Sequence, residues 1–182
     1  FLFELLKERI TSKLAERSLY CDKYLKFALR ILNRKKVLAF GDSHVKLFEG
    51  QDLIEAIHVG AATAYNLSEN STSTKAAQKI MNRISNPNIK PDQYCILLCF
   101  GEIDVRANIV KQSYKDNLEI KECARQVADR YIQFASRIVS LGFKLIIYGG
   151  YGAGTNRSAF GTEEQRNIAS FYLDKFLIDE CL

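Results

Sequence analysis

The segment from Gly41 to His44 places an acid, a hydroxyl and an imidazole in three consecutive positions, directly after the apolar run VLAF at residues 37–40. A serine next to a base can attack an ester carbonyl, so Asp42, Ser43 and His44 are candidate catalytic residues. The same residue types also cap helices, and either Ser43 or Asp42 could cap a short helix over HVKLFEG. Taken alone, the segment is compatible with both interpretations.

A second group of ionisable side chains follows a later apolar run, in the segment GEIDVR at residues 101–106. Glu102, Asp104 and Arg106 are candidates there for catalysis or for binding a substrate. They could equally be the charged side chains of a solvated loop, which is the usual location of such residues. A third loop, AATAYN after the run IHVG, adds Asn66 as a further candidate for binding.

Four short apolar runs must position these loops: VLAF from residue 37, IHVGA from 57, YCILLCF from 94 and KLIIYGG from 144. Each run is bounded by glycine or polar residues and is too short for a buried helix, so each predicts a strand. Helical patterns alternate with them, which predicts a three-layer α/β domain with a parallel sheet. With the strand order 2-1-3-4, the loops after strands one and three face each other at the switch point, where ligands bind.

Three helices are predicted between and after these strands. STSTKAAQKIMNRIS is expected to begin with Ser/Thr caps, and a long helix is expected from about Asn117 to Leu141, with Gly142 as its stop. The last helix is expected to begin at a capping box made by Thr162 and Gln165.

GDSH after a first strand, a lone glycine after the second and a G-x-x-D segment after the third together resemble the SGNH superfamily of serine esterases, also called GDSL-type hydrolases. The resemblance covers about residues 36–180 in block order and spacing, and it implies a flavodoxin-like fold. It implies that Ser43 is the nucleophile and that the backbone N–H groups of Ser43 and Gly60 form part of an oxyanion hole. Asp104 and Gly101 match the acid and the glycine of the family's G-x-N-D block. The implied reaction is hydrolysis or transfer of a small acyl group, for example acetyl on a carbohydrate, without a cofactor or a metal.

Two departures from the family pattern matter. Ile103 stands where the family has an asparagine that donates to the oxyanion, so we expect Arg106 or Glu102 to replace it. The family's basic D-x-x-H segment is missing, and the chain has only His44 and His58. We therefore expect a fifth strand and the base to lie beyond Leu182, since His44 is adjacent to Ser43 and His58 is expected to be a core or supporting residue.

Two rival functions remain open. Asp42, Glu102 and Asp104 could hold Mg²⁺ through oxygen ligands and hydrolyse a phosphate ester. Alternatively, the domain could be a catalytically degenerate SGNH-like module that binds a glycan or a protein.

Length and composition predict the number of domains, the location and the kinds of partner. The chain has 182 residues, 47% of them hydrophobic, which predicts one main domain over 36–182. Residues 1–35 predict a basic amphipathic helical arm, and its apolar stripe would pack on this domain, on a protein partner or on a second copy. The five cysteines show no metal-type pairing and favour a reducing, cytoplasmic location. We expect no nucleic-acid partner and no transmembrane segment.

Overall fold

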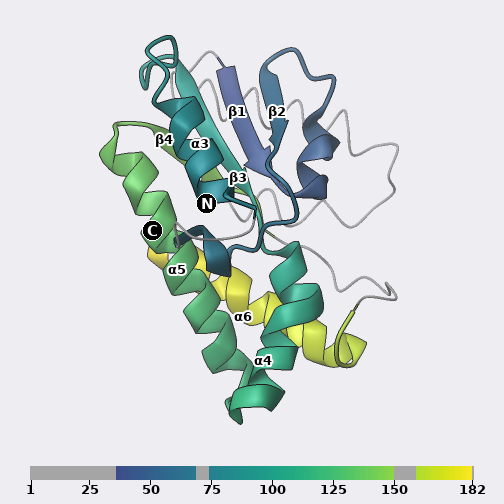
Figure 1. Cartoon of the computed structure of the whole chain (residues 1–182). Helices are drawn as coiled ribbons and strands as arrows, with labels where there is room; N and C mark the ends of the chain where they lie inside the picture. Colours follow the sequence, from purple (N-terminus) through teal and green to yellow (C-terminus); the bar gives the residue numbers. More distant parts are fainter. Residues whose placement is uncertain (1–35, 69–73, 150–158, 182) are drawn as a thin grey trace.

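The structure is a computed structural model that describes residues 36–68, 74–149 and 159–181. Its centre is a parallel sheet of four strands, with bounds β1 Lys36–Gly41, β2 Ile54–His58, β3 Tyr94–Cys99 and β4 Lys144–Ile147. The strand order is β2-β1-β3-β4, as predicted, and the sheet is flanked by helices in a flavodoxin-like arrangement (Figure 1).

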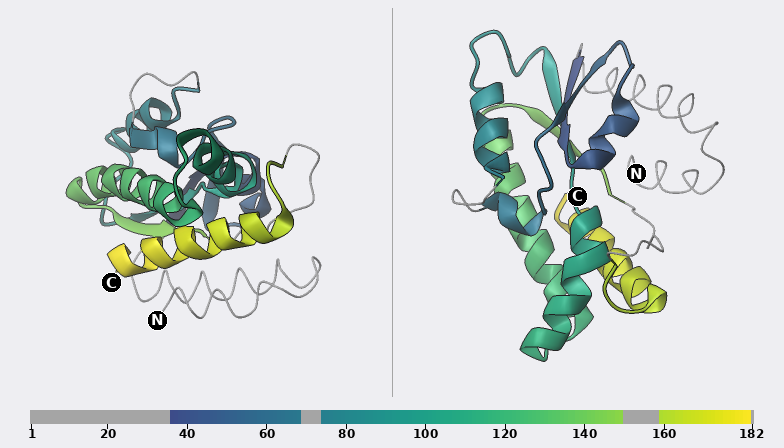
Figure 2. Two further views of the ribbon diagram at one scale, coloured as in Figure 1. Left: turned by 90° about the horizontal axis from the view of Figure 1, so that it is seen from below. Right: turned by 45° about the vertical axis from the view of Figure 1, so that its right-hand side comes forward.

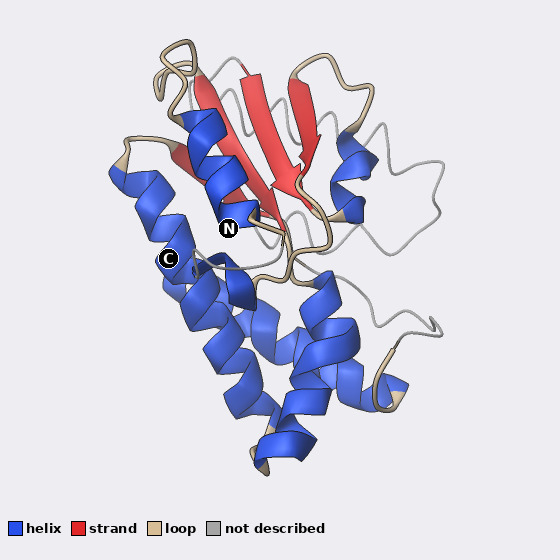
Figure 3. Ribbon diagram, in the orientation of Figure 1, coloured by secondary structure: helices blue, strands red, loops and turns tan. Residues whose placement is uncertain are grey.

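The helical elements fall between the strands and after the last one (Figure 3). They are η1 Ser43–Phe48, η2 Tyr65–Ser68, α3 Ala76–Ile84, η3 Asp104–Asn108, α4 Ile109–Asp116, α5 Ile120–Ser140 and α6 Glu163–Cys181. Of these, η1 and η2 are single 3₁₀ segments, and η3 is a π-helical turn that runs directly into α4.

The two faces of the sheet are packed by different elements. Leu38, Phe40, Ile96 and Leu98 belong to the larger core, together with side chains of α3, α4, α5 and α6. On the opposite face, the alternate strand residues pack with Val45 and Phe48 of η1. Figure 2 shows α3 and η1 on opposite sides of the strands in its right-hand view. This is the period-two alternation expected of a sheet that is covered on both faces.

The long helix and the last helix match their predictions closely. α5 runs from Ile120 to Ser140, and it is followed by Gly142, whose φ of +88° is a conformation that favours glycine. At the start of α6, the Thr162 N–H donates to Gln165 Oε1 at 2.9 Å, and the Gln165 N–H donates to Thr162 Oγ1 at 3.2 Å. The predicted capping box is therefore confirmed.

Three local predictions were wrong. The second strand ends at His58, earlier than predicted, because Val59 and Gly60 belong to the following loop. α3 begins at Ala76 after Lys75, without a side-chain cap, and not at the Ser/Thr cluster, part of which lies outside the described residues. The segment GEIDVR is helical rather than a loop, since the chain coils from Glu102 through η3 into α4.

The predicted arm over 1–35 lies outside the described residues, as does most of the loop GGYGAGTNR after β4. Among the helices of the described ranges, none combines the length and the apolar character needed to cross a membrane.

Candidate functional site

The carboxyl ends of β1, β2 and β3 are aligned in the sheet, and this alignment positions the residues of the site. In the register of the sheet, Gly41 at the end of β1 pairs with His58 of β2 and with Cys99 of β3. A Cβ on Gly41 would lie 2.6 Å from the Cys99 carbonyl oxygen, so only glycine allows the two strands to approach this closely here. The residues that follow the three strands therefore emerge at one edge of the sheet.

A cavity of about 500 Å³ opens at this edge. Its lining comes from the loop after β1, the end of β2 and the start of the helical segment after β3. The lining residues are Asp42, Ser43, His44, His58, Ala61, Glu102, Ile103 and Arg106. The structure thus brings together two of the predicted groups, GDSH and GEIDVR.

Asp42, and not Ser43, caps the short helix. The Asp42 side chain accepts a hydrogen bond from the His44 N–H at 2.9 Å, which is the N-cap contact of η1. The side chain of Ser43 is exposed, in the first position of η1. The capping interpretation of this segment therefore applies to Asp42, and the cap does not use the Ser43 hydroxyl.

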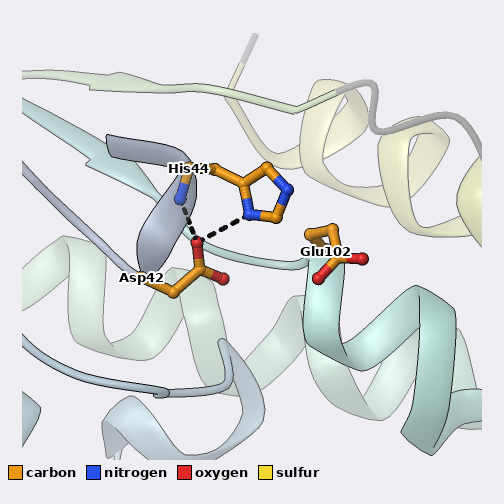
Figure 4. A group of neighbouring side chains, drawn as sticks. All are labelled: Asp42, His44 and Glu102. Carbon is orange, nitrogen blue, oxygen red and sulfur yellow. Dashed lines mark hydrogen bonds and ion pairs between the residues drawn. The ribbon is translucent and has the colours of Figure 1, made fainter. Parts of the chain in front are cut away.

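The same Asp42 oxygen also contacts the His44 ring. Asp42 Oδ1 lies 2.9 Å from His44 Nδ1, and Asp42 is only 1% exposed (Figure 4). The second oxygen, Oδ2, is buried and makes no hydrogen bond within the described part of the chain. Within the described part of the chain, both hydrogen bonds of the Asp42 side chain therefore use Oδ1, and both are with His44.

Glu102 and Arg106 form an ion pair on one side of the helical segment after β3. Arg106 Nε donates to Glu102 Oε1 at 2.5 Å across an i,i+4 spacing, and both side chains are mostly buried. A charge-assisted hydrogen bond of this kind fixes the orientation of both groups. The solvated-loop interpretation is wrong for this pair, because the two charges meet each other at the cavity wall.

Asp104 points away from the cavity lining and into the protein. It is fully buried, and its Oδ2 and Oδ1 accept hydrogen bonds from the backbone N–H groups of Ala64 at 2.7 Å and Tyr65 at 3.4 Å. Burial raises the pKa of Asp104 from 3.8 to about 7, although the two N–H groups lower it, and the charge of Asp42 also raises it. Asp104 therefore holds the loop after β2 and is not placed to ligate a metal in the cavity.

The remaining predicted residues lie around this loop. His58 is exposed at the end of an edge strand and lines the cavity, so its expected place in the core was wrong. Gly60 has a φ of +109°, which suits glycine, and it precedes the lining residue Ala61. Asn66 is exposed and does not line the cavity, while its backbone N–H donates to Thr63 Oγ1.

Three of the lining side chains could hold a cation. One ligand atom from each of Asp42, His44 and Glu102 lies within 4.8 Å of the others, and Figure 4 shows the three side chains converging. Glu102 already accepts from Arg106, and Asp42 already accepts from His44. Both carboxylates thus already accept hydrogen bonds from side chains of the chain itself.

A larger depression of about 650 Å³ lies along α6, lined by Glu163, Glu164, Asn167, Ile168, Phe171 and Tyr172. It contains no serine, cysteine or histidine, and none of the predicted site residues. The smaller cavity at the sheet edge is therefore the better candidate site.

The pairing of Glu102 with Arg106 and the anchoring of Ala64 by Asp104 were missed from the sequence. The i,i+4 spacing of Glu102 and Arg106 is a signal that could have indicated both a helix and the ion pair. No comparable signal exists for the contacts of Asp104 with Ala64 and Tyr65, which lie 40 and 39 positions away in the sequence.

Comparisons of this chain with models of protein families, with curated proteins and with solved structures find no match.

Proposed function

We propose that this protein is a serine esterase that hydrolyses or transfers a small acyl group, with Ser43 as its nucleophile. The observation that carries the proposal is the cavity at the carboxyl ends of β1 and β3, which an exposed Ser43 lines next to His44 and together with Arg106. Ligand sites in parallel α/β sheets lie at this edge, next to the point where the strand order reverses. The similarity of GDSH and GEID to SGNH blocks supports the same assignment.

In this proposal, Ser43 Oγ attacks the carbonyl carbon of the ester and forms an acyl-enzyme. The negative charge that develops on the carbonyl oxygen needs preorganised donors. The backbone N–H groups of Ser43 and Gly60 take this role, as the SGNH resemblance implies. The anchoring of Ala64 by buried Asp104 supports this part of the proposal, because it restrains the loop that carries Gly60.

Arg106 replaces the donor that Ile103 cannot supply. Ile103 and Arg106 both line the cavity, three residues apart on the helical segment. A guanidinium is a planar, permanently charged group of N–H donors, and the Nε–H of Arg106 donates to Glu102. The ion pair with Glu102 holds this cationic group at the wall of the cavity, where we propose that it stabilises the oxyanion.

The substrate is a small ester. A cavity of about 500 Å³ is in the lower half of the range for small-molecule sites. This volume suits a short acyl group, such as acetyl, on one sugar ring or a similar hydroxylated acceptor. The polar wall formed by Asp42, Glu102 and Arg106 favours a hydroxylated acceptor over a long acyl chain.

The proposal also includes a cytoplasmic location. Cys95, Cys99 and Cys123 are buried as thiols, which suits a reducing compartment. A role for residues 1–35 in self-association or in binding a protein partner remains a prediction.

Hydrolysis of short-chain 4-nitrophenyl esters and of acetylated sugars by the full chain tests the function. Ser43→Ala is expected to abolish turnover, whereas the matched variant Ser136→Ala, at an exposed position of α5, should retain it. Equal activity of Ser43→Ala and wild type would contradict the assignment. Binding of a glycan without any turnover would instead favour the degenerate binding module.

A further inference from the structure

We infer that His44, held by Asp42, is the general base that serves Ser43. The inference rests on the proposed esterase function, and it places the base within the GDSH segment itself. The SGNH pattern would place the base in a D-x-x-H segment near the C-terminus. The two possibilities differ in whether the removal of His44 abolishes activity.

Asp42 is fixed firmly enough to orient a base. It directly follows β1, which lies between β2 and β3 in the sheet, and its side chain is 1% exposed. Its Oδ1 accepts from the His44 backbone N–H, which sets the position of the carboxylate relative to the histidine main chain. The ring therefore meets an acceptor whose position is already determined.

The contact between Asp42 and the ring selects the tautomer of His44. A carboxylate oxygen only accepts hydrogen bonds, so a 2.9 Å contact from Oδ1 to Nδ1 places the proton on Nδ1. The other nitrogen, Nε2, then carries the lone pair that can take a proton. This is the relation between carboxylate and imidazole that serves general-base catalysis in serine hydrolases.

His44 and Ser43 lie in the same cavity but on neighbouring positions of a 3₁₀ turn, where side chains diverge by about 120°. A proton can also pass from a hydroxyl to a base through one bridging water. The side chain of His44 is 33% exposed, so such a water can reach the ring. We therefore assign the transfer from Ser43 Oγ to His44 Nε2 to a route through one water.

His44 takes up a proton and returns it in both steps of the reaction, so the protons balance. In acylation, the bond from Ser43 Oγ to the acyl carbon forms, the serine proton goes to His44, and the alcohol leaves with that proton as its C–O bond breaks. In deacylation, water attacks the acyl carbon, gives its proton to His44, and the proton returns to Ser43 Oγ as the acyl bond breaks. No oxidant, metal or second substrate is required for hydrolysis.

The charged side chains close to the His44 ring are mainly acidic. Asp42 lies beneath it, and Glu102 approaches from the helical segment after β3 (Figure 4). Arg106, which is paired with Glu102, offsets part of this negative charge, and His58 of β2 is the other imidazole of the cavity. The contact between Asp42 Oδ1 and His44 Nδ1 can persist when the ring takes up the proton of Ser43, because both ring nitrogens then carry a proton.

Turnover of 4-nitrophenyl acetate by variants of the full chain tests the inference. His44→Ala is expected to lower kcat on the order of 10²–10⁴-fold, and added imidazole should restore part of this loss after subtraction of the enzyme-free rate. The double variant Ser43→Ala/His44→Ala should show no rescue. The control variant Ser136→Ala, at an exposed position of α5 that does not line the cavity, should retain the activity.

Two further variants separate catalysis from folding. His44→Asn keeps a donor toward Asp42 Oδ1 but lacks a base, so it should fold with an unchanged Tm and remain inactive. Asp42→Asn should lower kcat with little change in KM, because the amide retains an acceptor for the cap but favours the wrong tautomer. Loss of activity in Ser43→Ala with full activity in His44→Ala would overturn the inference and leave the esterase function standing. Full activity of Ser43→Ala would overturn both.

Discussion

Asp104→Asn is expected to remove a pH dependence of stability that the buried carboxyl group imposes. Asp104 is fully buried, and burial raises its pKa to about 7 in the folded protein from an ordinary value of 3.8. Between these two pH values, the folded state binds a proton that the unfolded state has released. The contribution of Asp104 to the free energy of unfolding therefore falls as pH rises from about 4 to about 7, and it is constant above that range.

The size of the effect follows from the shift of the pKa. A difference of about 3 pKa units corresponds to about 4 kcal/mol at 1.36 kcal/mol per unit. Asparagine is nearly isosteric, stays neutral at every pH and can still accept from the Ala64 N–H through its amide oxygen. The variant should therefore match wild type at about pH 4 and exceed its stability by up to about 4 kcal/mol at about pH 8.

Urea unfolding of wild type and Asp104→Asn at a series of pH values measures this difference directly. Subtracting the two curves cancels the contributions of the other titrating groups, which the two proteins share. A difference that does not change with pH would refute the reasoning. The reasoning would also fail if wild type became more stable relative to the variant as pH rises. That result would mean that the N–H groups of Ala64 and Tyr65 lower the pKa of Asp104 by more than burial raises it.

Three further predictions concern the site and the strand that supports it. Arg106→Ala should lower kcat on the order of 10²–10³-fold with a small effect on KM, because it removes a donor to the oxyanion; steady-state kinetics check this, and a change confined to KM would contradict it. Gly41→Ala should lower the free energy of unfolding by about 1–3 kcal/mol, because the new methyl group overlaps the Cys99 carbonyl; urea titration checks this, and wild-type stability would show that β1 and β3 can separate. Chelation by EDTA and addition of Mg²⁺ should leave ester hydrolysis unchanged, as a rate assay can show, whereas Mg²⁺-dependent release of phosphate from a phosphate ester would favour the metal-dependent alternative.

The strands of the sheet were predictable because they carry strong local signals. Buried parallel strands appear as short apolar runs that end at glycine or polar residues, and VLAF and YCILLC show this pattern. Once the strands are parallel, the placement of GDSH and GEIDVR at one edge follows from topology. The capping box of Thr162 and Gln165 was similarly readable, because its partners lie three residues apart.

The directions of individual side chains were less predictable. GEIDVR was interpreted as a loop because a glycine precedes a run of charged residues, although Glu102 and Arg106 pair on a helix. Asp104 turns inward to two N–H groups from a loop distant in sequence, and no local pattern encodes that contact. His58 was expected to be a core or supporting residue, and the core alternative was wrong, because His58 ends an edge strand and is exposed at the cavity.

The assignment of Ser43 as the nucleophile is tested most directly by covalent labelling. A fluorophosphonate probe reacts with a serine whose hydroxyl is activated by a neighbouring base, and peptide mass spectrometry locates the adduct. We expect one adduct on Ser43 in wild type, none in Ser43→Ala and strongly slowed labelling in His44→Asn. An adduct on another serine, or no adduct on a folded full-length chain, would contradict it.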